Sequence, residues 1–177
     1  MADIDEPTAG TAILDTWGVA VAQKLNRMKV LTLTSDESTN SATLEDIEDL
    51  SFEVVSGRYY TVYLFGAYNV NATNQGLQLG FDAPAGDGYL TMKISGNGAP
   101  NTDTRARTSG AAAGSTATDS TNNREWWAWL WLQPTANGIV TIQLARGGTS
   151  GAPGVKILAG AGGMALESGG MPPEPPT

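Results

Sequence analysis

The chain has 177 residues, neither Cys nor His, and 18 Asp and Glu against 10 Lys and Arg, so its formal net charge is −8. This length favours one buried core with ordered tails. The absence of Cys and His excludes disulfides, thiol or imidazole catalysis and the usual zinc or haem ligand sets. We therefore expect no enzyme, no metal and no cofactor. Nucleic acid and membranes are poor partners because the charge is acidic and no apolar stretch approaches the ~20 residues that span a bilayer.

Residues 11–28 have the pattern of a short amphipathic helix. Apolar residues recur there at spacings of three, four, four and three, which places them on one stripe of about four turns. The stripe consists of Leu14, Trp17, Val21, Leu25 and Met28. A lone short helix is marginal in water, so two interpretations stay open. The stripe packs on its own domain, or it forms an interface with copies of itself or with a larger scaffold.

From Lys29 onward the apolar period changes to two, which is typical of half-buried strands. Residues 59–68 are apolar on both parities, with Tyr63 and Phe65 on the side opposite Val62, as expected for a strand covered on both faces. The other expected strands are residues 30–34, 50–54, 77–81, 89–94, 125–132, 139–145, 155–158 and 164–167. Short strands without interposed helices predict an all-β fold, an antiparallel β-sandwich or jelly roll.

Two segments lack the residues that build a core. Residues 95–123 contain almost no large apolar side chain and predict a long low-complexity loop. Residues 168–177 are Pro-rich and predict an extended arm. The predicted organisation is therefore an N-terminal arm and amphipathic helix (residues 1–28), a β-sandwich (residues 29–167) and a C-terminal arm.

Four of the five tryptophans fall within residues 126–131. In a strand, Trp127, Trp129 and Trp131 share one face, and the three even-numbered residues of the segment share the other. Both faces then need cover. We favour the core or a subunit interface, because a row of indoles is a large apolar area to leave in water. The alternative is a platform on which sugar rings stack.

An acidic run, Glu45, Asp46, Glu48 and Asp49, precedes Leu50. Such carboxylates suit a hard cation or general acid–base work, but they lack the spacing of a calcium loop, so we assign no metal ligand and no catalytic residue. A solvated turn is the favoured interpretation. A carboxylate-based glycan hydrolase that uses Glu45 and Glu48 is the weakest hypothesis.

Several segments together resemble a module of tailed-bacteriophage and prophage virion proteins. The module has a threonine-rich strand, then an acidic and apolar stretch that leads to a long tyrosine-containing strand. The matching segments are residues 32–34, 44–52, 57–60 with Tyr63, 138–145 and 159–166. The likeness is a pattern of strands rather than of catalytic residues, and Asp49 stands where the module more often has Gly.

Proteins with this module resemble head-decoration, head-fibre or tail accessory components, often trimeric, with a segment such as residues 12–28 as the attachment element. The resemblance implies no catalysis and no cofactor. The expected partners are further copies of the chain, as a homotrimer, and other virion proteins such as the major capsid or tail proteins. The alternative is a tail-associated module that binds a host receptor or surface glycan.

The expected location is the outer surface of the virion. The acidic start of the chain, residues 1–7, lacks the basic and apolar regions of a signal peptide, so we expect synthesis in the host cytoplasm.

Overall fold

The computed structural model describes residues 27–70, 75–94, 102–106, 109–114, 123–148 and 154–168. These ranges contain strands and no helix, which confirms the all-β prediction, and nothing in them has the length and apolarity of a membrane-spanning helix. The predicted helix lies outside the described residues up to residue 26, and Met28 begins a strand instead. The C-terminal arm likewise lies outside them from residue 169 onward, while Ser168 belongs to the last strand.

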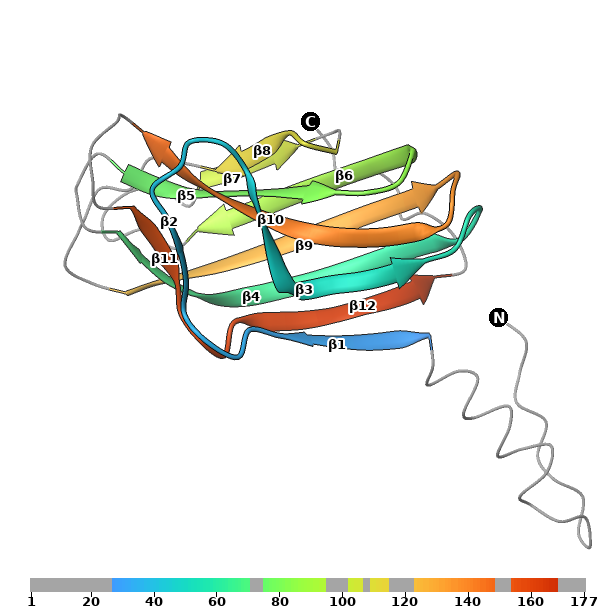
Figure 1. Ribbon diagram of the computed structural model, residues 1–177, viewed down its shortest axis with the longest axis horizontal. Helices are drawn as coiled ribbons and strands as arrows, with labels where there is room; N and C mark the ends of the chain where they lie inside the picture. Colours follow the sequence, from blue (N-terminus) through green and yellow to red (C-terminus); the bar gives the residue numbers. More distant parts are fainter. Residues whose placement is uncertain are drawn as a thin grey trace, which may run out of the picture.

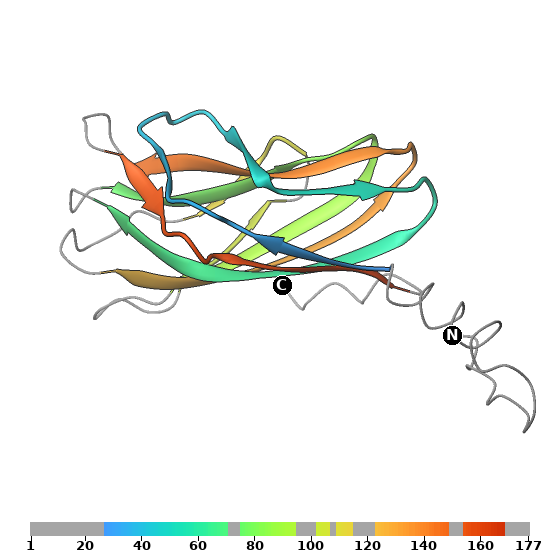
Figure 2. The same cartoon turned by 60° about the horizontal axis from the view of Figure 1, so that its bottom comes forward.

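The strands form two antiparallel sheets, stacked as a β-sandwich (Figures 1 and 2). The large sheet has the order β1 (Met28–Thr32), β12 (Gly162–Ser168), β4 (Tyr59–Val70), β9 (Arg124–Pro134), β6 (Gly86–Ile94) and β7 (Thr102–Ala106), and β11 (Val155–Ile157) joins β4 to β2 (Glu37–Thr39). The small sheet has the order β3 (Glu45–Val54), β10 (Gly138–Gly148), β5 (Gln75–Asp82) and β8 (Ala112–Gly114). The sandwich prediction is thus confirmed.

The core lies between the sheets and is built by the alternation that the sequence shows. On β4, Val62 and Leu64 point inward and are buried, as is Leu130 on β9. Trp126 is fully buried, and Gly66 stands opposite it on β4. A Cβ at Gly66 would lie 3.1 Å from the indole and 2.5 Å from the Cβ of Ala161. The glycine therefore makes room for the largest side chain of the core.

The acidic run is part of strand β3, so the predicted turn is wrong. Thr141 of β10 pairs with Ser51, but Gln143 pairs with Asp46, so the intervening residues of β3 bulge. Ile47 and Leu50 lie three residues apart and are both buried, which a regular strand cannot achieve. The bulge brings both into the core and leaves the carboxylates of the run exposed, as the sequence predicted for a solvated segment.

The long loop predicted at residues 95–123 also needs correction. It contains two short strands, β7 and β8, which pair with β6 and β5. The remainder of that segment lies outside the described residues, except for residues 109–111 and Asn123. Small and polar side chains hide these strands from a search for apolar alternation, because an edge strand is held by backbone hydrogen bonds.

Candidate functional site

Strand β9 sends its tryptophans to both faces of the large sheet. Trp126 points into the core, whereas Trp127 is 37% exposed, and Trp129 and Trp131 are half-buried on the outward side. The predicted division of the segment between two faces is confirmed. Of the two favoured positions for this segment, the core does not apply to Trp127, because this indole remains in contact with solvent, and a subunit interface stays a prediction.

The register of β4 against β9 extends this aromatic row sideways. Phe65 stands opposite Trp127, and Tyr63 stands opposite Trp129. Phe65 is 54% exposed and Tyr63 is 42% exposed. Strand β4 was predicted to be covered on both faces. Within the described residues its inward face is covered, but the exposed Tyr63 and Phe65 show that its outward face is open.

The apolar surface continues across β12 to the edge strand β1. Met164 of β12 stands opposite Tyr63, and Val30 of β1 stands opposite Met164. Met28 reaches the same side two residues before Val30, from a strand rather than from the predicted helix. The other predicted interface residues of the helix, Leu14, Trp17, Val21 and Leu25, lie outside the described residues.

We call this surface the outer face. It consists of Met28, Val30, Tyr63, Phe65, Trp127, Trp129, Trp131 and Met164. Of the large apolar side chains exposed in the described part of the chain, only Val55 and Ile139 lie elsewhere. At about 150–250 Å² for a whole aromatic side chain, the exposed fractions amount to roughly 500 Å². Monomers that expose patches of about 300–600 Å² often use them for binding.

Strand β6 closes one side of the outer face. Tyr89 stacks on Trp131 with ring centroids 5.3 Å apart and an interplanar angle of 22°. Thr91 stands opposite Trp129 and is buried, and Lys93 stands opposite Trp127. The open part of the outer face is thus centred on Phe65, Tyr63 and Trp127 rather than on Trp131.

Four residues of the outer face were not predicted as site residues from the sequence: Val30, Tyr63, Phe65 and Met164. One signal was available in the sequence. The odd-numbered residues of the segment 59–68 include large apolar side chains, as do the odd-numbered residues of the tryptophan segment. Only the register shows that these residues stand side by side, because strand pairing joins segments that are far apart along the chain.

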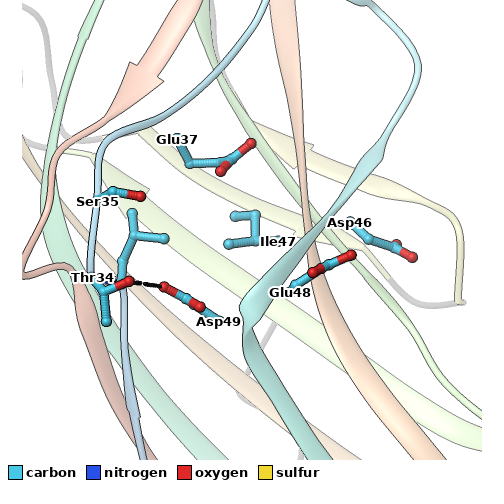
Figure 3. Close-up of a pocket in the computed structure, with 8 residues that line it drawn as sticks. Thr34, Ser35, Glu37, Asp46, Ile47, Glu48 and Asp49 are labelled. Carbon is cyan, nitrogen blue, oxygen red and sulfur yellow. Dashed lines mark hydrogen bonds between the residues drawn. The ribbon is translucent and has the colours of Figure 1, made fainter.

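The acidic run lies on the other layer, where Asp46, Glu48 and Asp49 line one side of a recess (Figure 3). Asp49 Oδ2 accepts hydrogen bonds from the Thr34 backbone N–H at 2.9 Å and from the Thr34 hydroxyl at 2.7 Å. Both hydrogen bonds stabilise the charged carboxylate and hold the pKa of Asp49 below its usual value. The bond from the backbone N–H has the larger effect, and the bond from the hydroxyl has the smaller one. In Figure 3 this carboxylate turns toward Thr34 and away from Asp46 and Glu48.

The remaining contacts of the run also hold strands in place. Asp46 Oδ1 accepts a hydrogen bond from Gln143 Nε2 at 2.8 Å, which ties β3 to β10 beside the bulge. Among the residues that the structure describes, no three acidic side chains gather in a way that could hold a metal ion. The hydrolase hypothesis for Glu45 and Glu48 gains no support from these contacts.

No protein-family model matches the chain, and no curated protein matches it either. Among solved structures, a carbohydrate-binding module in complex with β-1,4-galactotriose resembles it with a TM-score of 0.42 and 7% sequence identity. The alignment covers 73% of this chain and 93% of that module. A likeness of this degree assigns no function to the chain.

Proposed function

We propose that this chain is a non-enzymatic accessory subunit displayed on the outer surface of a tailed-bacteriophage particle, and that it works by burying apolar surface against other proteins. The observation that carries the proposal is the outer face. Aromatic and aliphatic side chains that a core would normally hide stand in one continuous surface on four neighbouring strands. Contact with another protein removes that surface from water.

The size of the outer face suits this role. Burying about 500 Å² at about 25 cal/mol per Å² gives a gross gain of about 12 kcal/mol. Association costs about 4–15 kcal/mol in lost motion and ordering, and the partner's own buried surface adds to the gain. Burial of the outer face is therefore of the same size as the cost of association, and the partner's surface supplies the surplus that would hold the subunit in place without any chemistry.

The phage setting of the proposal rests on the sequence resemblance. The first matching segment, residues 32–34, covers the end of β1 and the two residues after it. The second, residues 44–52, covers most of β3, and the third, residues 57–60, leads into β4. In this proposal the segment before β1, residues 1–26, attaches the subunit to the major capsid or tail proteins. The acidic side chains of β3 keep the free subunit soluble before assembly.

Immunogold labelling of whole particles with an antibody against the β-sandwich tests the proposal. Labelled heads or tails are expected, and particles without label would contradict it. Deletion of residues 1–26 tests the attachment role of this segment. The truncated chain keeps the Arg27 carbonyl, which accepts a hydrogen bond from the Glu167 N–H, so the β-sandwich should still fold. This truncated chain should show the far-ultraviolet spectrum of a folded β protein and should fail to join particles. Incorporation at the level of the full chain would refute the attachment role.

Glycan binding is the second candidate, and one observation favours it. Trp127, Trp129 and Trp131 point outward at two-residue spacing, about 7 Å apart along one strand, and pyranose rings stack on exposed aromatic rings such as that of Trp127. Tryptophan fluorescence titrated with host polysaccharide distinguishes the candidates. A saturable change that Trp127→Ala removes, and that Ile139→Ala on the small sheet leaves intact, would favour a glycan ligand.

A further inference from the structure

We infer that the outer face is covered by the outer face of a second copy of this chain, so that the assembling unit is a twofold dimer packed large sheet to large sheet. The inference rests on the proposed function and names the first partner that the subunit meets. Four observations support it: the shape of the face, its area, its composition and the distribution of charge over the two layers.

The shape of the outer face matches a known way in which sheets pack. Two sheets pack face to face about 10 Å apart with their strands nearly aligned, and their side chains interdigitate. Phe65 and Tyr63 stand on the middle strand β4, whose outward side chains are the most exposed aromatic ones. Gly162 stands opposite Phe65 on β12 and has no side chain to flank the ring. The second copy presents the same profile, as a twofold contact requires.

The area and composition fit a dimer. Stable interfaces bury about 800 Å² on each partner, and in homodimers about 65% of that area is apolar. The apolar part of such a patch is therefore close to the roughly 500 Å² estimated from the exposed fractions of the outer face. The two faces have the same area because they are the same surface. One contact of this kind uses the whole of each outer face, so it forms pairs rather than the trimer that the sequence resemblance implies.

Charge explains how two acidic molecules can meet. Each copy has a net charge of −8, so most relative orientations are repelled. The exposed carboxylates of β3 belong to the small sheet, which lies in the layer away from the outer face (Figure 2). These residues are Glu45, Asp46, Glu48, Asp49 and Glu53. Contact through the large sheets keeps the two acidic layers on opposite sides of the dimer.

The outer face itself has few charges. The outward positions of β4 and the exposed outward positions of β12 and β1 hold no acidic or basic residue. On β6 and β9 the charged residues at outward positions are Lys93 and Glu125, which are of opposite sign and stand at one end of the tryptophan row, and Asp87, which stands beyond Trp131 at the other end. A second copy therefore meets an apolar centre whose few charges stand at the two ends of the tryptophan row, and a partner of high positive charge would be drawn to β3 instead.

The mass of the full chain in solution tests the inference. Sedimentation equilibrium over a hundredfold range of concentration should give twice the subunit mass of 18.4 kDa at the upper end. Phe65→Glu should place a charge in the centre of the contact, weaken the dimer at least a hundredfold and leave a folded monomer. The matched control is Ile139→Glu, because Ile139 is 61% exposed on a strand of the small sheet. This control should remain a dimer.

Three results would overturn the inference: a wild-type monomer at every concentration, a wild-type trimer, or a dimer that Phe65→Glu leaves intact. Should Phe65→Glu fail to fold, Val30→Glu replaces it, since Val30 is 71% exposed at the edge of the same face. Particle incorporation separates the inference from the proposed function. If the protein is a monomer and still joins particles, the dimer alone is overturned. If the protein is a dimer and the antibody never labels particles, the virion role alone is overturned.

Discussion

Trp126 and Trp127 are neighbours in the sequence, and their replacement by Ala should have very different effects on the free energy of unfolding. Trp126 is fully buried over Gly66, so its removal leaves a cavity between the sheets and should cost about 3–5 kcal/mol. Trp127 is 37% exposed and stands between Phe65 of β4 and Lys93 of β6 on the outward side of the sheet. Water fills the space it leaves, so only the transfer of its buried part is lost, about 1–2 kcal/mol.

Urea unfolding followed by circular dichroism measures both losses. In the Phe65→Glu background, where self-association should not contribute, Trp126→Ala should lower the midpoint by about 2 M if the m-value is about 2 kcal/mol per M. Trp127→Ala should lower the midpoint by less than half as much, with an unchanged m-value. Equal losses for the two variants, or a larger loss for Trp127→Ala, would mean that the outer face is covered within the subunit and would refute the assignment of an open surface.

Three further predictions concern the β-sandwich itself. Gly66→Val should destabilise by about 1–3 kcal/mol by overpacking the core beside the indole, and an unchanged urea midpoint would show that the core has spare room. Tyr60→Phe removes the hydroxyl that accepts the Val55 N–H at 2.9 Å and should cost about 1 kcal/mol, which thermal unfolding detects. The lowered pKa of Asp49 means that its charged form adds stability above the ordinary value of 3.8 and that this stability is lost as the pH falls through the lower folded value. Asp49→Asn should thus melt below the wild type at pH 6, with the gap closing below pH 3.8; a gap that persists in acid would contradict the assignment of the Thr34 contact.

The strands that the sequence predicted well are those with one buried face. Residues 50–54 and 77–81 both lie within observed strands, because alternation records burial directly. The sequence failed at the start of β3, where the bulge lets Ile47 and Leu50 enter the core three residues apart. A period of two cannot describe that segment, so a strand was predicted as a turn.

The candidate site was predicted only in part, and the reason is physical. Alternation separates Trp127 from Trp126, but it cannot say which of two apolar parities meets the second sheet, since both look equally buried in the sequence. The answer depends on the neighbours across the sheet, such as Phe65 beside Trp127 and Gly66 beside Trp126. Strands β4 and β9 are about sixty residues apart in the chain. The pattern of apolar residues within one segment cannot show that the two strands pair.

The edges of the sandwich indicate why association should occur through a face. An unpaired edge strand is a template for further pairing, and proteins blunt such edges with short strands, lysine and bulges. The edge strand β1 is short and has Lys29 near its middle, and the edge strand β3 has the bulge and several exposed carboxylates. These two of the edge strands thus oppose the addition of another strand, and the edge strand β8 at the other side of the small sheet has only three residues. The described part of the chain offers the aromatic outer face for contact, and an apolar face beside the protected edge strand β1 favours a closed pair over an open-ended chain of subunits.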